Sequence, residues 1–185
     1  MKYPTFQMSH VDTELTELQI KQVSDSGIVH LGAYGLGALA ELQAVAWLKE
    51  IGANPVWNNG LYDRDITVGN IALDVKHTCT HFYPFPEGTV SVKQSSLDHQ
   101  YGSIMVFVWL KKDADKPKLH TSVDTAYLVG WLFPDEVTQC QKINAGHTWR
   151  DGSTMQYNSY RVQLQDMRPM EQLATVLVQI GRAHV

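Results

Sequence analysis

The sequence has few cysteines and no long hydrophobic run. Only Cys79 and Cys140 occur among 185 residues, so a disulfide framework is not expected and a reducing cytoplasm is the predicted compartment. No apolar run approaches the ~18–20 residues that cross a bilayer. The opening MKYPTFQMSH also lacks the apolar region of a signal peptide. These absences predict a cytoplasmic protein with no membrane partner.

An excess of positive charge is missing as well. The formal net charge is −4, which gives no global indication of nucleic-acid binding, so any polyanion site has to be a local patch. The length of 185 residues and the hydrophobic fraction of 44% suit one ordinary globular domain over residues 1–185.

Periodicity along the chain predicts alternating helices and strands. We expect helices at 12–23, at 36–51 with Gly52 just beyond the end, and at 170–181 after Pro169. We expect strands at 103–110, 125–133 and 159–164, the first of them apolar throughout and therefore covered on both faces. The stretch 90–102, VSVKQSSLDHQYG, is predicted as a helix from which Lys93 or Gln94 could contact phosphate. The fold class is α/β, with a mixed central β-sheet, helices on both sides and a core at about 36–133.

The stretch YDRDITVGNIALDVK, residues 62–76, predicts a β-hairpin. Gly69 and Asn70 suit a two-residue type II′ turn, which places Val68 opposite Ile71 and Asp65 opposite Asp74. Alternate residues then switch faces. One face is entirely apolar, and the other carries Asp63, Asp65, Thr67, Ala72, Asp74 and Lys76. A one-residue slip would bury the carboxylates, so the pattern fixes the register.

The facing carboxylates of this hairpin require a positive partner. Directly opposed side chains lie about 5 Å apart at Cβ, and two like charges at that distance repel by roughly 3 kcal/mol at an effective dielectric of 20. Lys76 could offset part of this, but a hard divalent cation with oxygen ligands fits better. Glu41 shares a helix stripe with apolar residues, so it is expected to point inward and could complete the site.

Glu41, Asp65 and the run Asp74-Val75-Lys76 resemble the PD-(D/E)XK nuclease superfamily, which has the restriction-endonuclease-like fold. In that family a helix supplies a Glu, one strand supplies an Asp, and the next strand supplies (D/E)-x-K. The resemblance covers residues 36–110. Arg64 stands where the family's Pro is expected, and no Q-x-x-x-Y pattern follows Lys76.

The resemblance implies metal-assisted hydrolysis of phosphodiester bonds. Asp65 and Asp74 would hold Mg²⁺, or Mn²⁺ as a substitute, together with the Val75 carbonyl and Glu41. Lys76 would orient or help to deprotonate the attacking water. The expected enzyme is a DNA endonuclease rather than an exonuclease, with RNA also possible as substrate. A homodimer would suit the cutting of both strands.

Four other interpretations compete with the nuclease. Gly35, Gly37 and Ala40 fit the dinucleotide-binding pattern G-x-G-x-x-A, but no acidic residue follows at the next strand to bind a ribose, so an oxidoreductase is less favoured than close helix packing at these glycines. His77, Cys79 and His81 alternate and could bind a second metal, with His99, His120 or Cys140 as a fourth ligand. A catalytically silent nucleic-acid-binding module on the same fold and an unrelated protein with a solvated polar hairpin also remain open.

Overall fold

The architecture is mixed α/β. A computed structural model describes residue 3 and residues 5–7, 33–58, 64–98, 104–112 and 123–182. Its main sheet has six strands in the order β1-β7-β6-β4-β3-β2. Strands β4 and β6 are parallel, and the other neighbours in this sheet are antiparallel. The strands are β1 (Thr5–Gln7), β2 (Pro55–Trp57), β3 (Ile66–Val68), β4 (Ile71–Thr80), β6 (Ile104–Lys112) and β7 (Val123–Leu132).

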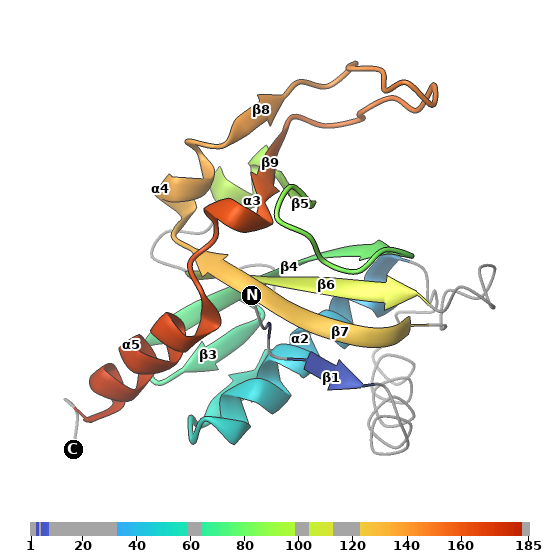
Figure 1. The fold of residues 1–185 in the computed structure, drawn as a ribbon. Coiled ribbons are helices and arrows are strands. Elements are labelled where there is room, and N and C mark those ends of the chain that lie inside the picture. The colour runs from blue at the N-terminus through green and yellow to red at the C-terminus, as the bar shows by residue number, and fades with distance from the viewer. Residues whose placement is uncertain are drawn as a thin grey trace.

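A second sheet of three strands, ordered β5-β9-β8, lies beside the first and forms the upper part of the molecule in Figure 1. Its strands are β5 (Thr89–Lys93), β8 (Gln141–Ile143) and β9 (Ser159–Gln163). Short helices α3 (Gln94–Asp98) and α4 (Pro134–Val137) and the 3₁₀ turn η1 (Leu164–Asp166) flank this sheet. Two long helices, α2 (Ala33–Glu50) and α5 (Met170–Arg182), lie on the opposite side of the main sheet (Figure 1).

Two hydrophobic clusters separate these layers. The first joins α2 and α5 to one face of the main sheet through residues such as Leu48, Val106 and Leu173. The second joins the other face to the second sheet, and it includes Phe107 and Val162. Residues 104–111 of β6 are all buried, so the expectation of a central strand covered on both faces is confirmed.

Helix α2 carries Glu41, and its end is fixed by backbone hydrogen bonding. The Gly52 N–H donates to the Lys49 carbonyl at 3.0 Å, and the Ala53 N–H donates to the Leu48 carbonyl at 2.9 Å. Gly52 has φ +81°, which glycine adopts without a Cβ clash, and the two bonds form a Schellman motif. The predicted end of this helix is therefore confirmed. Its start lies at Ala33, so Gly35 and Gly37 belong to the helix.

The predicted hairpin is also present. Val68 pairs with Ile71, Thr67 with Ala72 and Ile66 with Leu73, around Gly69 with φ +56°. The apolar face packs into the first cluster. This ladder ends at Ile66 and Leu73, so the expected pair of Asp65 and Asp74 lies beyond it.

Two fold expectations need correction. Residues 89–93 form strand β5 and only 94–98 are helical, because Val90 and Val92 alternate with outward polar residues and bury against the second cluster. The two long helices of the described residues also lie on one face of the main sheet, and the other face is covered chiefly by the second sheet. The strands and helix expected at 125–133, 159–164 and 170–181 are confirmed within a few residues. The helix expected at 12–23 lies outside the described residues.

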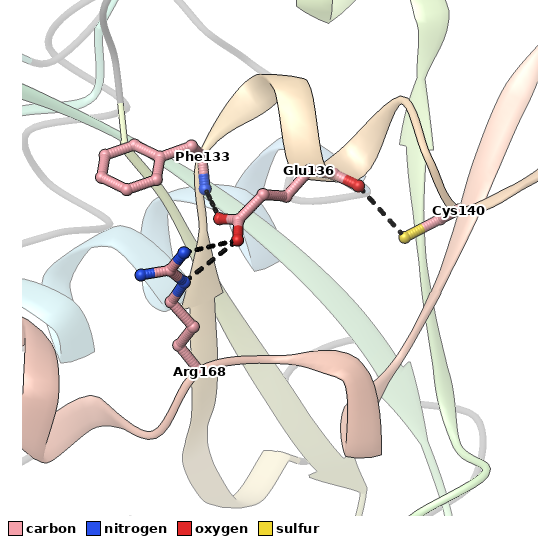
Figure 2. Close-up of polar contacts among 4 residues, drawn as sticks. All are labelled: Phe133, Glu136, Cys140 and Arg168. Carbon is pink, nitrogen blue, oxygen red and sulfur yellow. Dashed lines mark hydrogen bonds and ion pairs between the residues drawn. The ribbon is translucent and has the colours of Figure 1, made fainter.

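A polar cluster joins the two layers where β7 ends (Figure 2). Glu136 on α4 accepts a hydrogen bond from the Phe133 N–H at 2.9 Å. Its Oε1 also accepts two from Arg168, at 3.1 Å from Nε and 2.7 Å from Nη2. The guanidinium carbon of Arg168 lies 5.1 Å from the centroid of Trp131. The cluster therefore fixes the segment that leads into α5 against the end of β7.

Candidate active site

The candidate site forms where β3 ends and β4 continues without it. Beyond Leu73, β4 pairs with β6 on one side, while its ladder with β3 on the other side has stopped. The Val75 N–H at this edge donates to Asp65 Oδ2 at 2.6 Å. A buried backbone N–H without a partner is costly, so the Asp65 carboxylate takes the place of the missing strand.

Asp74 and Lys76 lie on the face of β4 that is turned towards the second sheet. Their register partners in β6 are Met105 and Phe107, which both belong to the second cluster. The Asp74 side chain is only 5% exposed and that of Lys76 is 20% exposed. The Lys76 ammonium lies 2.9 Å from Asp74 Oδ1 and 2.8 Å from Oδ2. The ion pair is largely buried, and the interpretation of a solvated hairpin face is wrong for Asp74.

Glu41 approaches from α2, which packs on the opposite face of the main sheet, against Leu73 and Val75, and its charge interacts with those of Asp74 and Lys76. The Trp57 Nε1–H donates to Glu41 Oε2 at 2.7 Å, and Trp57 is the last residue of β2. Glu41 is partly buried on a helix turn whose neighbours Ala40 and Ala44 are buried, in agreement with the inward orientation that the helix stripe predicts. The next residue, Asn58, donates its N–H to the Asp65 carbonyl at 2.8 Å, so Glu41 and Asp65 are linked through the end of β2.

The electrostatics of the cluster are governed by burial and by shared negative charge. Burial raises the pKa of Asp65 to about 7, with further increases from the charges of Asp74 and Glu41, against lowering by the Val75 N–H and Lys76. Burial also raises the pKa of Glu41, which the Trp57 hydrogen bond lowers and Asp74 raises. One lysine therefore faces three carboxyl groups, and the cluster lacks positive charge.

The donor set fits a hard divalent cation. Asp74 Oδ2 is buried and lies 2.8 Å from the Lys76 ammonium, and the carboxylate oxygens of Asp74, Asp65 and Glu41 are the ligand type that such a cation prefers. Within the described part of the chain, no three Asp, Glu, His or Cys side chains already converge as a metal-binding group. In this arrangement Lys76 lies on Asp74 and Glu41 is bonded to Trp57, so side-chain rotation would have to bring the carboxylates together.

Where the structure describes them, the other predicted metal-binding residues do not join this cluster. Cys79 packs against the first hydrophobic cluster, and His81 is exposed beyond the end of β4. With His77 they do not form a metal-binding group. Asp63, His99 and His120 lie outside the described residues, and Cys140 packs against the second cluster.

The glycines of α2 do not form a phosphate-binding turn, because Gly35 and Gly37 lie inside the helix. The oxidoreductase interpretation therefore loses its motif. A Cβ added at Gly37 would lie 3.7 Å from His77 Cε1, an ordinary contact, so close packing does not require glycine at this position either.

Sequence reasoning missed Trp57, which holds Glu41. A signal was available, because alternation along PVW turns Pro55 and Trp57 to one face and leaves Val56 exposed. The role of Trp57 as a hydrogen-bond donor was not visible in the sequence, because it depends on the packing of β2 against α2. The two residues that this bond joins, Glu41 and Trp57, are 16 positions apart.

No protein-family model matches the chain, and no match was found among curated proteins. Within the described ranges, no helix combines the length and the apolar character that crossing a bilayer requires.

Proposed function

We propose that the protein is a Mg²⁺-dependent nuclease that hydrolyses phosphodiester bonds in DNA. The observation that carries this proposal is the Asp74–Lys76 pair beside Asp65 and Glu41, in which Asp74 is buried and one lysine is set against three carboxyl groups. A buried ion pair is weak support for stability, because desolvation offsets much of its Coulombic energy. The presence of this pair at an interrupted sheet edge is better explained by a catalytic role than by a stabilising one.

In this proposal Asp65, Asp74 and Glu41 hold Mg²⁺, with the Val75 carbonyl as a further ligand. When bound, the ion would polarise the scissile phosphate and stabilise negative charge on the leaving oxygen. Lys76 is two residues after Asp74 and lies on the same face of β4. Its ammonium would orient the attacking water and offset charge in the transition state once it has left Asp74. Val75 keeps Asp65 in place through its N–H.

The proposal is tested with supercoiled circular DNA, linear DNA and RNA, each incubated with Mg²⁺ or with EDTA. We expect cleavage in Mg²⁺ alone, and cutting of the circle would identify an endonuclease. Asp74→Asn and Lys76→Met should each lower the rate by a factor on the order of 10² or more. The exposed α2 residues Glu50 and Lys49 supply matched controls, Glu50→Gln and Lys49→Met, that should cut at the parent rate. Equal rates in all variants would place catalysis elsewhere.

A catalytically silent nucleic-acid-binding module is the second candidate. It is favoured by the contact of Lys76 with both oxygens of Asp74, because such a pair is partly neutralised without a metal. A parent protein that binds DNA equally in Mg²⁺ and EDTA and cuts none of the substrates would support this candidate and refute the nuclease.

A further inference from the structure

The second sheet and the segment between β8 and β9 carry cations that are supported by aromatic rings. Lys93 Nζ lies 4.4 Å from the centroid of Tyr157, and the guanidinium carbon of Arg161 lies 5.0 Å from the centroid of Trp149. Lys142 Nζ lies 5.9 Å from Tyr160, near the outer limit of such contacts. These three contacts thus occur within the three strands of this sheet and one connecting segment.

Lys93 and Arg161 lie on one face of this sheet. Ser91 pairs with Arg161 and Lys93 pairs with Ser159, so the two cations are diagonal neighbours on adjacent strands. Val90, Val92 and Val162 point the other way, into the second cluster. The face with the cations is therefore the outer face of the sheet, turned away from the main sheet.

The connecting segment 144–158 projects beyond the rest of the molecule (orange, top of Figure 1). It is tied to the sheet at its base, where the Gln94 N–H donates to the Asn158 carbonyl at 2.9 Å and the Ala145 N–H donates to Asn158 Oδ1 at 2.9 Å. Trp149 and Tyr157 come from this segment, and Tyr157 is 54% exposed. The projecting segment thus brings rings to the cations of the sheet.

Within the described part of the chain, no carboxylate forms an ion pair with Lys93 or Arg161. Among the described residues, ion pairs are formed by Lys76 and Arg168, whereas Lys93 and Arg161 contact rings and a hydroxyl, Thr89 Oγ1 at 3.3 Å from Arg161. Residues 141–163 contain three Lys or Arg and a single acid, Asp151, whose carboxylate is bonded to Ser153 at the tip. Of these cations Lys142 pairs with Tyr160 on the other face of the sheet, so in a chain of net charge −4 Lys93 and Arg161 form the local positive patch.

We propose that Lys93, Arg161, Trp149 and Tyr157 form a surface that binds a single-stranded nucleic-acid segment of the substrate. In this proposal the cations contact the phosphates, and the exposed Tyr157 ring and the half-buried Trp149 ring accept stacked bases, which is the combination that single strands require. An acidic polypeptide would use the cations but not the rings. The surface deepens the proposed nuclease function by giving the substrate a second contact, but its binding can be measured without cleavage.

The test is fluorescence anisotropy of a labelled single-stranded oligonucleotide in EDTA, measured at several salt concentrations. Lys93→Gln with Arg161→Gln should weaken binding about tenfold, and should reduce the slope of log affinity against log salt by about 1–1.5, since each phosphate contact on a single strand contributes about 0.7. Tyr157→Leu should weaken binding of the oligonucleotide without changing the slope of log affinity against log salt. Lys49→Gln is the control and should change neither quantity. Arg161→Lys keeps the charge and should keep the slope, which tests the proposal even if the Gln variant unfolds.

Unchanged affinity and slope in the double variant would overturn this surface. Poly-glutamate that binds the parent as tightly as the oligonucleotide does, and that loses this binding in the double variant, would also overturn it. Duplex DNA bound more tightly than the single strand at this surface would overturn the single-strand assignment. The outcome for this surface can be distinguished from the outcome for the nuclease proposal. A parent that never cuts DNA but shows the expected slopes would support the surface and reject the enzyme. A parent that cuts DNA, together with a double variant that binds and cuts at the parent level, would support the enzyme and reject the surface.

Discussion

Asp65 has two roles that conflict with each other. Its carboxylate holds the Val75 N–H at the interrupted edge of β4, yet burial and the neighbouring acids raise its pKa to about 7. A raised pKa means that the folded protein binds this proton more tightly than the unfolded chain does. The free energy of unfolding should therefore fall as pH rises from about 4 to about 7, and should stay lower above that range.

Asp65→Asn should remove this loss of stability. The amide oxygen can still accept the Val75 N–H, and it carries no charge at any pH. We expect the variant to gain stability relative to the parent between pH 5 and pH 8, by about 1–3 kcal/mol, measured by urea unfolding in EDTA. Glu50→Gln, at an exposed position, is the control. Parallel pH profiles for the Asn variant and the parent would contradict the buried charge.

Trp57→Phe should free Glu41 while keeping most of the packing of β2. The Trp57 N–H lowers the pKa of Glu41, so its loss should raise that pKa, and protons should compete more strongly with a cation for Glu41. We expect a weaker apparent affinity for Mg²⁺ in a thermal-shift titration, about three- to tenfold, with recovery at higher pH. Glu41→Gln should keep the fold and lose most of the cleavage activity. Full activity in Glu41→Gln would leave a site of two acids.

At the scale of elements, the Arg168–Glu136 contact fixes the entry to α5 (Figure 2). Both side chains are partly exposed, so the ion pair itself contributes about 1 kcal/mol or less, and the stacking of Arg168 on Trp131 adds roughly 0.5–1 kcal/mol. Arg168→Ala should therefore lower the free energy of unfolding by about 1–2 kcal/mol, measured by urea unfolding.

Arg168→Lys separates the two contributions in the same experiment, because it keeps the charge and loses the two-point hydrogen bonding. A double-mutant cycle with Glu136→Gln gives the coupling between the partners. No coupling would mean that ring packing alone holds Arg168.

Elements with a strong local signal could be predicted from the sequence. The hairpin has complete alternation around a Gly-Asn turn, and α2 ends at a glycine with positive φ, so both were placed correctly. The second sheet carried a weaker signal. Its strands β5 and β9 pair Val90 with Val162, and contact over such a separation leaves no local pattern beyond a short alternation. The stretch 90–102 was therefore predicted as a helix, and the sheet that faces Asp74 was missed.

The candidate site shows the same division between local and distant information. The D-x-K spacing puts Asp74 and Lys76 on one face wherever the strand lies, so their proximity followed from local sequence. The hydrogen-bond partner of the Asp65 carboxylate did not follow from local sequence. Asp65 was expected to face Asp74 across a ladder, but the ladder ends one residue earlier and its carboxylate bonds the backbone of Val75 instead.

At the scale of the whole molecule, metal binding should couple to folding through these carboxylates. Mg²⁺ at tenfold excess over its dissociation constant should raise the melting temperature by about 3–6 °C. The rise should be larger at pH 8 than at pH 5.5, because protons compete with the cation for Asp65. Differential scanning fluorimetry with Mg²⁺, Mn²⁺ and EDTA measures this.

Asp74→Asn should abolish the thermal response to Mg²⁺, and Glu50→Gln should retain it. A response that is equal in Asp74→Asn and in the parent would remove the carboxylate cluster from metal binding. A response that does not change with pH would contradict the raised pKa of Asp65.

The hydrogen bond between the Val75 N–H and Asp65 Oδ2 also makes one backbone position a spectroscopic reporter. A proton donor in a 2.6 Å contact with a carboxylate is deshielded, and loses part of that deshielding when the acceptor is neutralised. The amide resonance of Val75 in an ¹⁵N-correlated NMR spectrum should therefore move as pH passes through about 7, the pKa that burial gives Asp65. It should move again when a cation takes the carboxylate, so the charge state of the site can be followed without any substrate.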